Sequence, residues 1–138
     1  MSYELRIAKF YGGIAFIVLV AIDKFSKYLI RLRQLADGGF YICNQNISWS
    51  IAIPGYVFWT FWTTLIVLLL VAIKNRYFIH STSYMILILA GAISNIIDRL
   101  YYVCVIDFID LRFWPVFNLA DIFIVSGVVF LLVEWKKI

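Results

Sequence analysis

Apolar residues follow one another along the chain in four long blocks, separated by short polar segments. Each block approaches the length of about 20 mostly apolar residues that a helix needs to cross a bilayer. The pattern predicts a membrane protein of the all-α class with four transmembrane helices. The predicted spans cover about residues 10–30, 56–73, 78–97 and 116–133.

Composition supports a membrane environment. Hydrophobic residues make up 64% of the chain and charged residues 14%, against roughly 45–50% and about 25% in soluble domains. One small core could not bury this excess. The chain has 138 residues, which suits one domain. We therefore expect residues 1–138 to form a single integral membrane domain whose first apolar block is retained, because no small-x-small cleavage site follows it.

The polar segment between the first two spans is predicted to contain strands. Residues 47–53 alternate large apolar residues with the small residues Ser48, Ser50 and Ala52, a strand signature. Asn44–Asn46 separates this run from Phe40–Cys43, which predicts a hairpin-like turn, and Asp37–Gly39 should end the preceding helix. Tyr101–Ile109, between the last two spans, is a further β-like stretch. Both fall on one side of the membrane, where we expect a small sheet.

The charge distribution favours one orientation. Four spans place both termini on the same side. Basic residues occur on both sides, but aspartates accompany them only on the side opposite the termini. Because unpaired positive charge favours the cytoplasm, we expect cytoplasmic termini and an extracytoplasmic sheet.

Cysteine and histidine residues are few. One His and two Cys form no cluster with metal-ligand spacing, so we expect no metal site. Cys43 and Cys104 lie far apart, and two free or buried thiols are favoured over a disulfide. No aromatic-basic pattern suggests nucleic acid as a partner.

Charged residues inside the spans are the first candidates for function, since each costs at least roughly 2.5–3.5 kcal/mol near the bilayer centre. On the first span, Asp23 and Lys27 are four residues apart and can pair. On the third, Asn95 and Asp98 share a helix face with Gly91. Structural ion pairs explain Asp23–Lys27 and Asp98–Arg99 as well as function does.

The fourth span carries Asn118 and Asp121 on one face, and Asp107 comes from the β-like stretch before it. Hydrogen bonding between helices is slightly favoured over direct chemistry for Asn95 and Asn118. Asp121 lies inside an apolar span with no basic neighbour, which favours function. Two close carboxylates cannot both ionise easily, so one keeps a proton while the other acts as a base, as in aspartic proteases.

In this order and spacing, the polar blocks resemble the lipoprotein signal peptidases, also called signal peptidase II. The matching segments are Asp23-x-x-x-Lys27, the Asn44 region, Gly91–Arg99, Val105–Phe108 and Phe117–Asp121. The resemblance implies four transmembrane helices, an extracytoplasmic β-cradle and a catalytic aspartate dyad. The family usually has glycine at the positions of Asn46, Ala90 and Ser94, and phenylalanine at that of Trp49.

By this resemblance, Asp107 and Asp121 activate water to cleave a prolipoprotein before its diacylglyceryl-modified cysteine. The resemblance also implies a bacterial inner-membrane enzyme with no metal or organic cofactor, whose partners are membrane lipids and the lipid-modified prolipoprotein. We expect a monomer. The residues matching positions that support the dyad or hold substrate are Asn44, Asn95, Asp98, Arg99, Asn118, Asp23 and Lys27.

Two other functions are compatible with buried acids. A small cation or proton transporter, or a channel subunit, could use Asp98, Asp107 and Asp121. A non-catalytic lipoprotein-binding relative would bind substrate without cleaving it. A transporter needs a polar path through the whole membrane, and the polar residues here stop in its outer half. An enzyme pocket therefore fits the pattern better.

Overall fold

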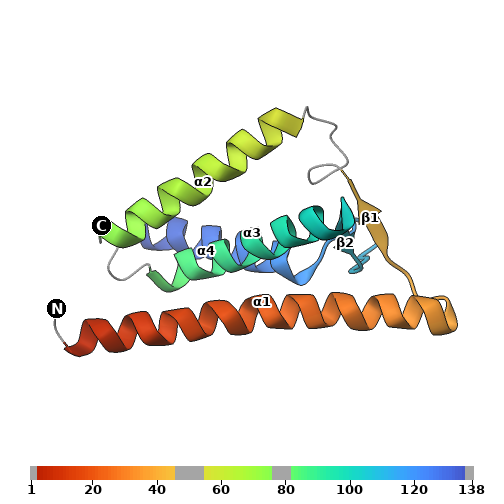
Figure 1. Ribbon diagram of the computed structural model, residues 1–138, viewed down its shortest axis with the longest axis horizontal. Coiled ribbons are helices and arrows are strands. Elements are labelled where there is room, and N and C mark those ends of the chain that lie inside the picture. The colour runs from red at the N-terminus through yellow and green to blue at the C-terminus, as the bar shows by residue number, and fades with distance from the viewer. Residues whose placement is uncertain (1–2, 46–54, 76–81, 136–138) are drawn as a thin grey trace.

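The computed structural model of the chain describes residues 3–45, 55–75 and 82–135. These residues form mostly helix, with one small antiparallel sheet, as the hydrophobic pattern predicts (Figure 1). Within them the elements are α1 (Tyr3–Asp37), β1 (Ile42–Asn44), α2 (Gly55–Asn75), α3 (Thr82–Tyr102), β2 (Val105–Asp107) and α4 (Leu119–Trp135).

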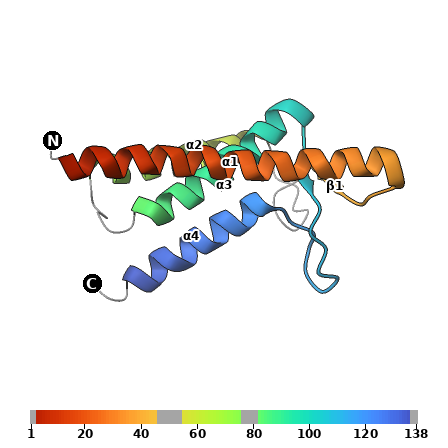
Figure 2. The same cartoon turned by 90° about the horizontal axis from the view of Figure 1, so that it is seen from below.

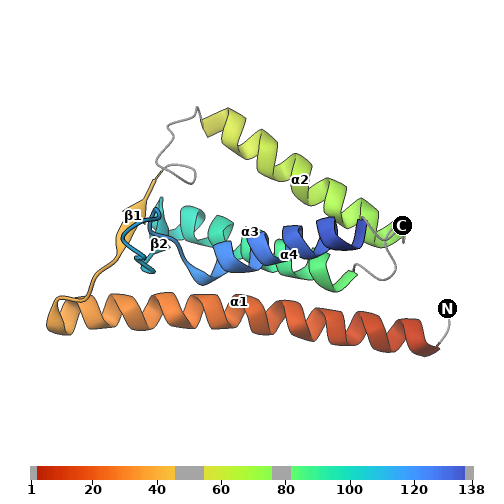
Figure 3. The same ribbon diagram turned by 180° about the vertical axis from the view of Figure 1, so that it is seen from behind.

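The helices lie around α3. Helices α1 and α4 pack against it, and α2 contacts mainly α3 (Figures 1 and 3). Seen from below, α4 approaches α1 toward the sheet end and diverges from it at the other end (Figure 2). The sheet lies at one end of the helices, and the first turn of α1 and the last turn of α4 lie at the opposite end.

Two glycines allow α3 and α4 to pack closely. A Cβ atom on Gly91 would overlap the carbonyl oxygen of Ala120, and one on Gly127 would lie 2.7 Å from the carbonyl oxygen of Tyr84. Small residues at such contacts let helix backbones approach, as is common in membrane proteins. The resulting α3–α4 contact supports one side of the candidate site.

The helices coincide with the predicted spans but differ at their ends. Helix α1 extends beyond residues 10–30 and ends at Asp37, where Gly38 adopts a left-handed φ of 73° that glycine accepts at a helix C-terminus. Helix α4 begins at Leu119, because Phe117 pairs with Ile109 in a β-bridge before the helix starts.

Large apolar side chains are exposed along α1, α2 and α4, such as Ile17 at 66%, Leu68 at 60% and Leu132 at 61%. Of the helices in the described part of the chain, one, Ser83–Tyr102, is long and apolar enough by length and composition to cross a membrane. In α1, by contrast, Asp23, Lys24 and Lys27 interrupt the apolar run, and α4 has 17 residues, the lower end of the range of about 17–25 that spanning requires.

The strand prediction was partly wrong. Asn44, expected in a turn, is the last residue of β1, which pairs with β2: Ile42 opposes Asp107 and Asn44 opposes Val105. The partner expected for this strand, Ile47–Ile53, lies outside the described residues. In the second β-like stretch, Tyr101 and Tyr102 end α3 instead of joining the sheet. Short-range alternation could not reveal a pairing between residues as far apart as Ile42 and Asp107.

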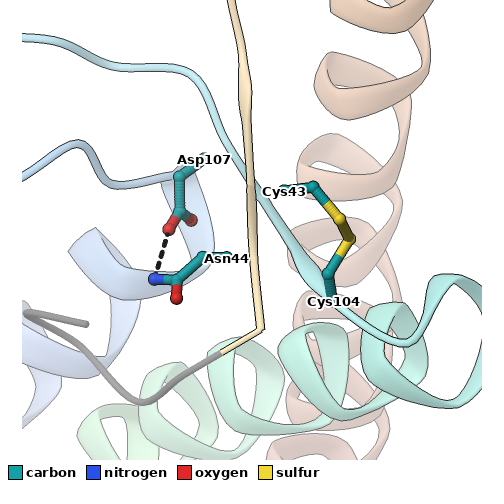
Figure 4. Close-up of a disulfide and its surroundings, with 4 residues drawn as sticks. All are labelled: Cys43, Asn44, Cys104 and Asp107. Carbon is teal, nitrogen blue, oxygen red and sulfur yellow. Dashed lines mark hydrogen bonds between the residues drawn. A yellow bond between two sulfur atoms is a disulfide. The ribbon is translucent and has the colours of Figure 1, made fainter. Parts of the chain in front are cut away.

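The expectation of free thiols was also wrong. Cys43 and Cys104 form a disulfide with a Cα–Cα distance of 5.4 Å (Figure 4). The pairing of β1 with β2 brings them together, because Cys43 opposes Ile106 and Cys104 lies two residues before it. Their sequence separation of 61 residues concealed this proximity.

Candidate active site

Four charged side chains join α1 to α3. Lys27 Nζ lies 2.7 Å from Asp23 Oδ2 and 2.6 Å from Asp98 Oδ2, and Lys24 forms a second ion pair with Asp98. Asp23, Lys27 and Asp98 are buried. Removing one partner of a buried pair costs about 3–5 kcal/mol, because the remaining charge is left uncompensated. This cluster therefore fixes α1 against α3.

Asp23 also connects both helices to α4. Its Oδ1 accepts a hydrogen bond from the backbone N–H of Ala120 at 2.9 Å, and its Oδ2 accepts one from Ser94 Oγ at 2.6 Å. The N–H groups of a first helical turn have no partner within the helix, and a negative charge there is favourable. The hydroxyl of Ser94 thus takes part in the contact between α1 and α3.

Asn95 links the charge cluster to Asp121. Its Oδ1 accepts a hydrogen bond from Lys27 Nζ at 3.0 Å, and its Nδ2 donates to Asp121 Oδ1 at 2.8 Å. The amide thus uses both its acceptor and its donor. Asn95 does form hydrogen bonds between helices, and through them it orients one of the two candidate acids.

Asn118 contacts both candidate acids. Asn118 is the N-cap of α4. Its Oδ1 accepts a hydrogen bond from the backbone N–H of Asp121 at 3.0 Å, and its own backbone N–H donates one to Asp121 Oδ2 at 3.2 Å. This reciprocal arrangement is a capping box. The Nδ2 of the same buried side chain donates to Asp107 Oδ1 at 2.6 Å. The start of α4 therefore sets the position of one acid relative to the other.

Asp107, the last residue of β2, is 3% exposed. Its Oδ2 accepts a hydrogen bond from Asn44 Nδ2 at 2.9 Å (Figure 4). Together with the bond from Asn118, this means that amide donors hold both carboxylate oxygens. Burial raises the pKa of Asp107 to about 6, and the negative charge of Asp121 acts in the same direction. The hydrogen bonds from Asn44 and Asn118 and the charge of Lys27 oppose this rise in pKa.

A cavity of about 400 Å³ contains both acids. A few polar side chains and a larger number of apolar ones line it, which is the usual make-up of a ligand site. The polar residues that line it are Asn44, Asn95, Arg99, Asp107, Asp121 and Ser126; the apolar ones are Val105, Leu111, Phe113, Trp114, Pro115, Val116, Phe117, Ile122 and Val125.

Two carboxyl groups in one such cavity can share a proton, with one as acid and the other as base. A water molecule between them could then be activated for attack on a carbonyl group, and the proton could pass to the leaving group. Among the described residues, no group of three or more His, Cys, Asp or Glu is arranged to hold a metal ion.

Some residues of the site escaped the sequence reasoning. Lys24 donates to the carbonyl oxygen of Ser94 and to Asp98; its position next to Asp23 was the available signal. Phe113 and Trp114 line the cavity from the segment between β2 and α4, where an aromatic run around Pro115 was the only clue. Asn46, Trp49 and His80 lie outside the described residues.

The family model for signal peptidase (SPase) II matches residues 15–136. The chain belongs to the signal peptidase II family. It is thus a member of a family of aspartic peptidases, as its paired carboxyl groups suggest. It is 36% identical to the lipoprotein signal peptidase of Syntrophomonas wolfei, covering 91% of each chain. It is 35% identical to that of Moorella thermoacetica, covering 83% of this chain and 85% of the relative.

Two solved structures have the same fold as this chain. Two bacterial membrane enzyme structures superpose with TM-scores of 0.70 and 0.69, each at 23% identity and over 92% of this chain. The aligned region covers 88% of the first solved chain and 93% of the second. At this identity the likeness establishes the fold alone.

Proposed function

We propose that this signal peptidase II removes signal peptides from prolipoproteins, cleaving before a diacylglyceryl-modified cysteine, with Asp107 and Asp121 as its catalytic dyad. The observation that carries the proposal is the bonding of Asn118 to both acids at the wall of one cavity. The names of the curated relatives, lipoprotein signal peptidases, support the substrate class.

In the proposed mechanism, the dyad carries one proton. The charged carboxylate accepts a proton from water as the water attacks the scissile carbonyl carbon, and the protonated carboxyl donates to the departing amine. The fixed amide donors Asn44, Asn95 and Asn118 hold the carboxylates in place without supplying protons of their own, which limits reorganisation during the reaction. Arg99 lines the same cavity and supplies positive charge near the developing oxyanion.

The apolar wall of the cavity suits a substrate that arrives through lipid. Ile122 and Val125 continue along α4 from Asp121 and line the cavity. A signal peptide is apolar over much of its length, and the modified cysteine carries two acyl chains. Their burial against these apolar residues would leave the scissile bond near Asp107 and Asp121.

We further propose that residues 1–138 form one integral membrane domain with four spans, in the bacterial inner membrane, and that it acts as a monomer with cytoplasmic termini. The exposed apolar side chains of α1, α2 and α4 support several membrane-facing helices. The disulfide supports an extracytoplasmic position for the sheet, because disulfides persist in oxidising compartments.

Asp107→Asn and Asp121→Asn test the dyad. Each is expected to fold and to accumulate uncleaved prolipoprotein, with cleavage reduced by at least about 10³-fold, as for other residues that act as one unit. Incubation of the purified enzyme with a diacylglyceryl-modified prolipoprotein, followed by gel electrophoresis, measures this. Asp110→Asn is the matched control: Asp110 is exposed and accepts a hydrogen bond from its own loop, at Arg112 N. Normal cleavage by either dyad variant contradicts the assignment.

A further inference from the structure

The disulfide and the Asn44–Asp107 hydrogen bond lie on opposite faces of the same strand pair. Side chains of successive strand residues point to alternate faces, and Figure 4 shows Cys43 and Asn44 leaving β1 on opposite sides. Cys43 bonds to Cys104 on one face, and Asn44 Nδ2 donates to Asp107 Oδ2 on the other. Each link joins residues that are offset along the ladder rather than directly opposed.

The strand pair itself specifies its register weakly. β1 and β2 have three residues each, and an isolated two-stranded ribbon is marginally stable in water. β2 is buried, whereas Ile42 of β1 is 43% exposed and Cys43 is exposed. Little apolar burial therefore opposes a shift of β1 along β2.

A register shift would change the contact between Asn44 and Asp107. A slip of one residue moves every side chain of a strand to the opposite face, which would turn Asn44 away from Asp107. A slip of two residues keeps the face but displaces Asn44 by roughly 7 Å along the ladder. Because Asn44 opposes Val105 in the present register, such a slip in one direction carries it out of reach of Asp107. In the other direction it brings Asn44 directly opposite Asp107 and replaces the diagonal contact from which the present hydrogen bond forms.

We propose that the Cys43–Cys104 disulfide is a positioning element of the active site, fixing the register of β1 on β2 so that Asn44 donates to Asp107. The inference rests on the proposed assignment of Asp107 to the catalytic dyad. It makes activity dependent on the redox state of this bond. A dithiol reductant transfers two electrons and two protons, which break the S–S bond and form two thiols, while the reductant becomes a disulfide.

The chain offers a clean test, since it contains two cysteines and both are in this bond. Wild type and the Cys43→Ser/Cys104→Ser variant are assayed in detergent with diacylglyceryl-modified prolipoprotein, with and without dithiothreitol. Reduction of wild type, verified by the mass gained on maleimide labelling, is expected to lower kcat by roughly tenfold, the effect of one lost hydrogen bond to a charged group. The double variant should show the lower kcat without reductant and no further response to it.

A double-mutant cycle separates positioning from general destabilisation. Asn44→Ala should lower kcat in the disulfide-bonded enzyme but have little further effect in the cysteine-free enzyme, because Asn44 no longer contacts Asp107 there. The fall of activity at high pH should move to higher pH in the cysteine-free enzyme, as in Asn44→Ala. The charged groups facing Asp107, namely Lys27 of α1, Arg99 of α3 and Asp121 of α4, are unchanged in these variants.

Each outcome has a distinct meaning. Additive effects of the two changes, or equal kcat in oxidised, reduced and cysteine-free enzyme, overturn the positioning role. Two thiols that label without reductant in freshly prepared enzyme overturn it too. If the oxidised wild type itself fails to cleave the substrate, the proposed function fails instead, so the two failures are distinguishable.

Discussion

At the scale of single residues, the site depends on asparagines that hold carboxylates. Asn118 donates to Asp107 and caps α4 at Asp121, Asn95 donates to Asp121, and Asn44 donates to Asp107. An amide group orients a buried carboxylate without neutralising it, whereas a lysine at the same place would form an ion pair. The acids therefore keep the capacity to exchange a proton.

The pH dependence of cleavage should report the proton on the dyad. With Asp121 charged, the one-proton form requires a protonated Asp107, whose pKa is about 6. Activity is thus expected to decline as pH rises through about 6. Asn44→Ala removes a donor that favours the charged form, which raises the pKa of Asp107 and moves the decline to higher pH.

A pH profile of kcat/KM over the acidic and neutral range measures this shift, with Asp110→Asn as the control that should retain the wild-type profile. A decline in Asn44→Ala at the same or lower pH than in wild type contradicts the assigned role of the amide. The profile belongs to the coupled pair of acids, so the comparison between variants is the informative quantity.

At the scale of elements, the close approach of α3 and α4 determines whether the acids meet. Asp121 is on the first turn of α4, and Asn95, which orients it, is one turn after Gly91 on α3. The carbonyl oxygen of Ala120 occupies the space that a side chain at Gly91 would need. Backbone contact at this glycine thus sets the spacing between the two helices beside the site.

Gly91→Ala is expected to destabilise the protein by about 1–3 kcal/mol through overpacking against backbone, and to lower activity by displacing Asp121 from Asn95. Gly13→Ala is the matched control. Gly13 is also helical, but a Cβ atom there meets nothing within 4 Å, so the change should stabilise α1 by up to about 1 kcal/mol. Thermal unfolding in detergent, followed by circular dichroism, compares them. Equal stability of the two variants argues against the close contact.

Contacts within one helix could be predicted from the sequence, whereas contacts between helices could not. Helical periodicity placed Asp23 with Lys27 and Asn118 with Asp121, because residues three or four apart share a helix face, and both pairs form. The contact of Asp23 with Ala120 spans 97 residues, and no local pattern indicates which helix end a buried acid will cap. Lys24 pairs with Asp98, 74 residues away, a separation that helical periodicity does not reach.

At the scale of the whole molecule, the site and the sheet lie toward one end of the helices, and the start of α1 and the end of α4 lie at the other (Figure 1). In the proposed four-span topology, this arrangement places the start of α1 and the end of α4 on the side of the membrane opposite the cavity. A substrate anchored in the outer leaflet would then meet the cavity directly.

The proposed orientation predicts the behaviour of reporter fusions. Green fluorescent protein at the C-terminus should fluoresce, and alkaline phosphatase there should be inactive, because that enzyme acquires its disulfides only outside the cytoplasm. Alkaline phosphatase inserted at Gly38, directly after α1, should be active. The opposite pattern, measured in intact cells, contradicts cytoplasmic termini.

By itself, the sequence determined that the chain is mostly helical and apolar, where its helices lie, and which polar residues share a helix face, because these features depend on residues a few positions apart. Tertiary structure alone decided that Cys43 reaches Cys104, that Asn44 lies in a strand against Asp107, and that Asp23 caps α4. These contacts join residues 61 to 97 positions apart. They arise from the packing of α1 and α4 on α3 and from the pairing of two strands too short to be recognised from their own residues.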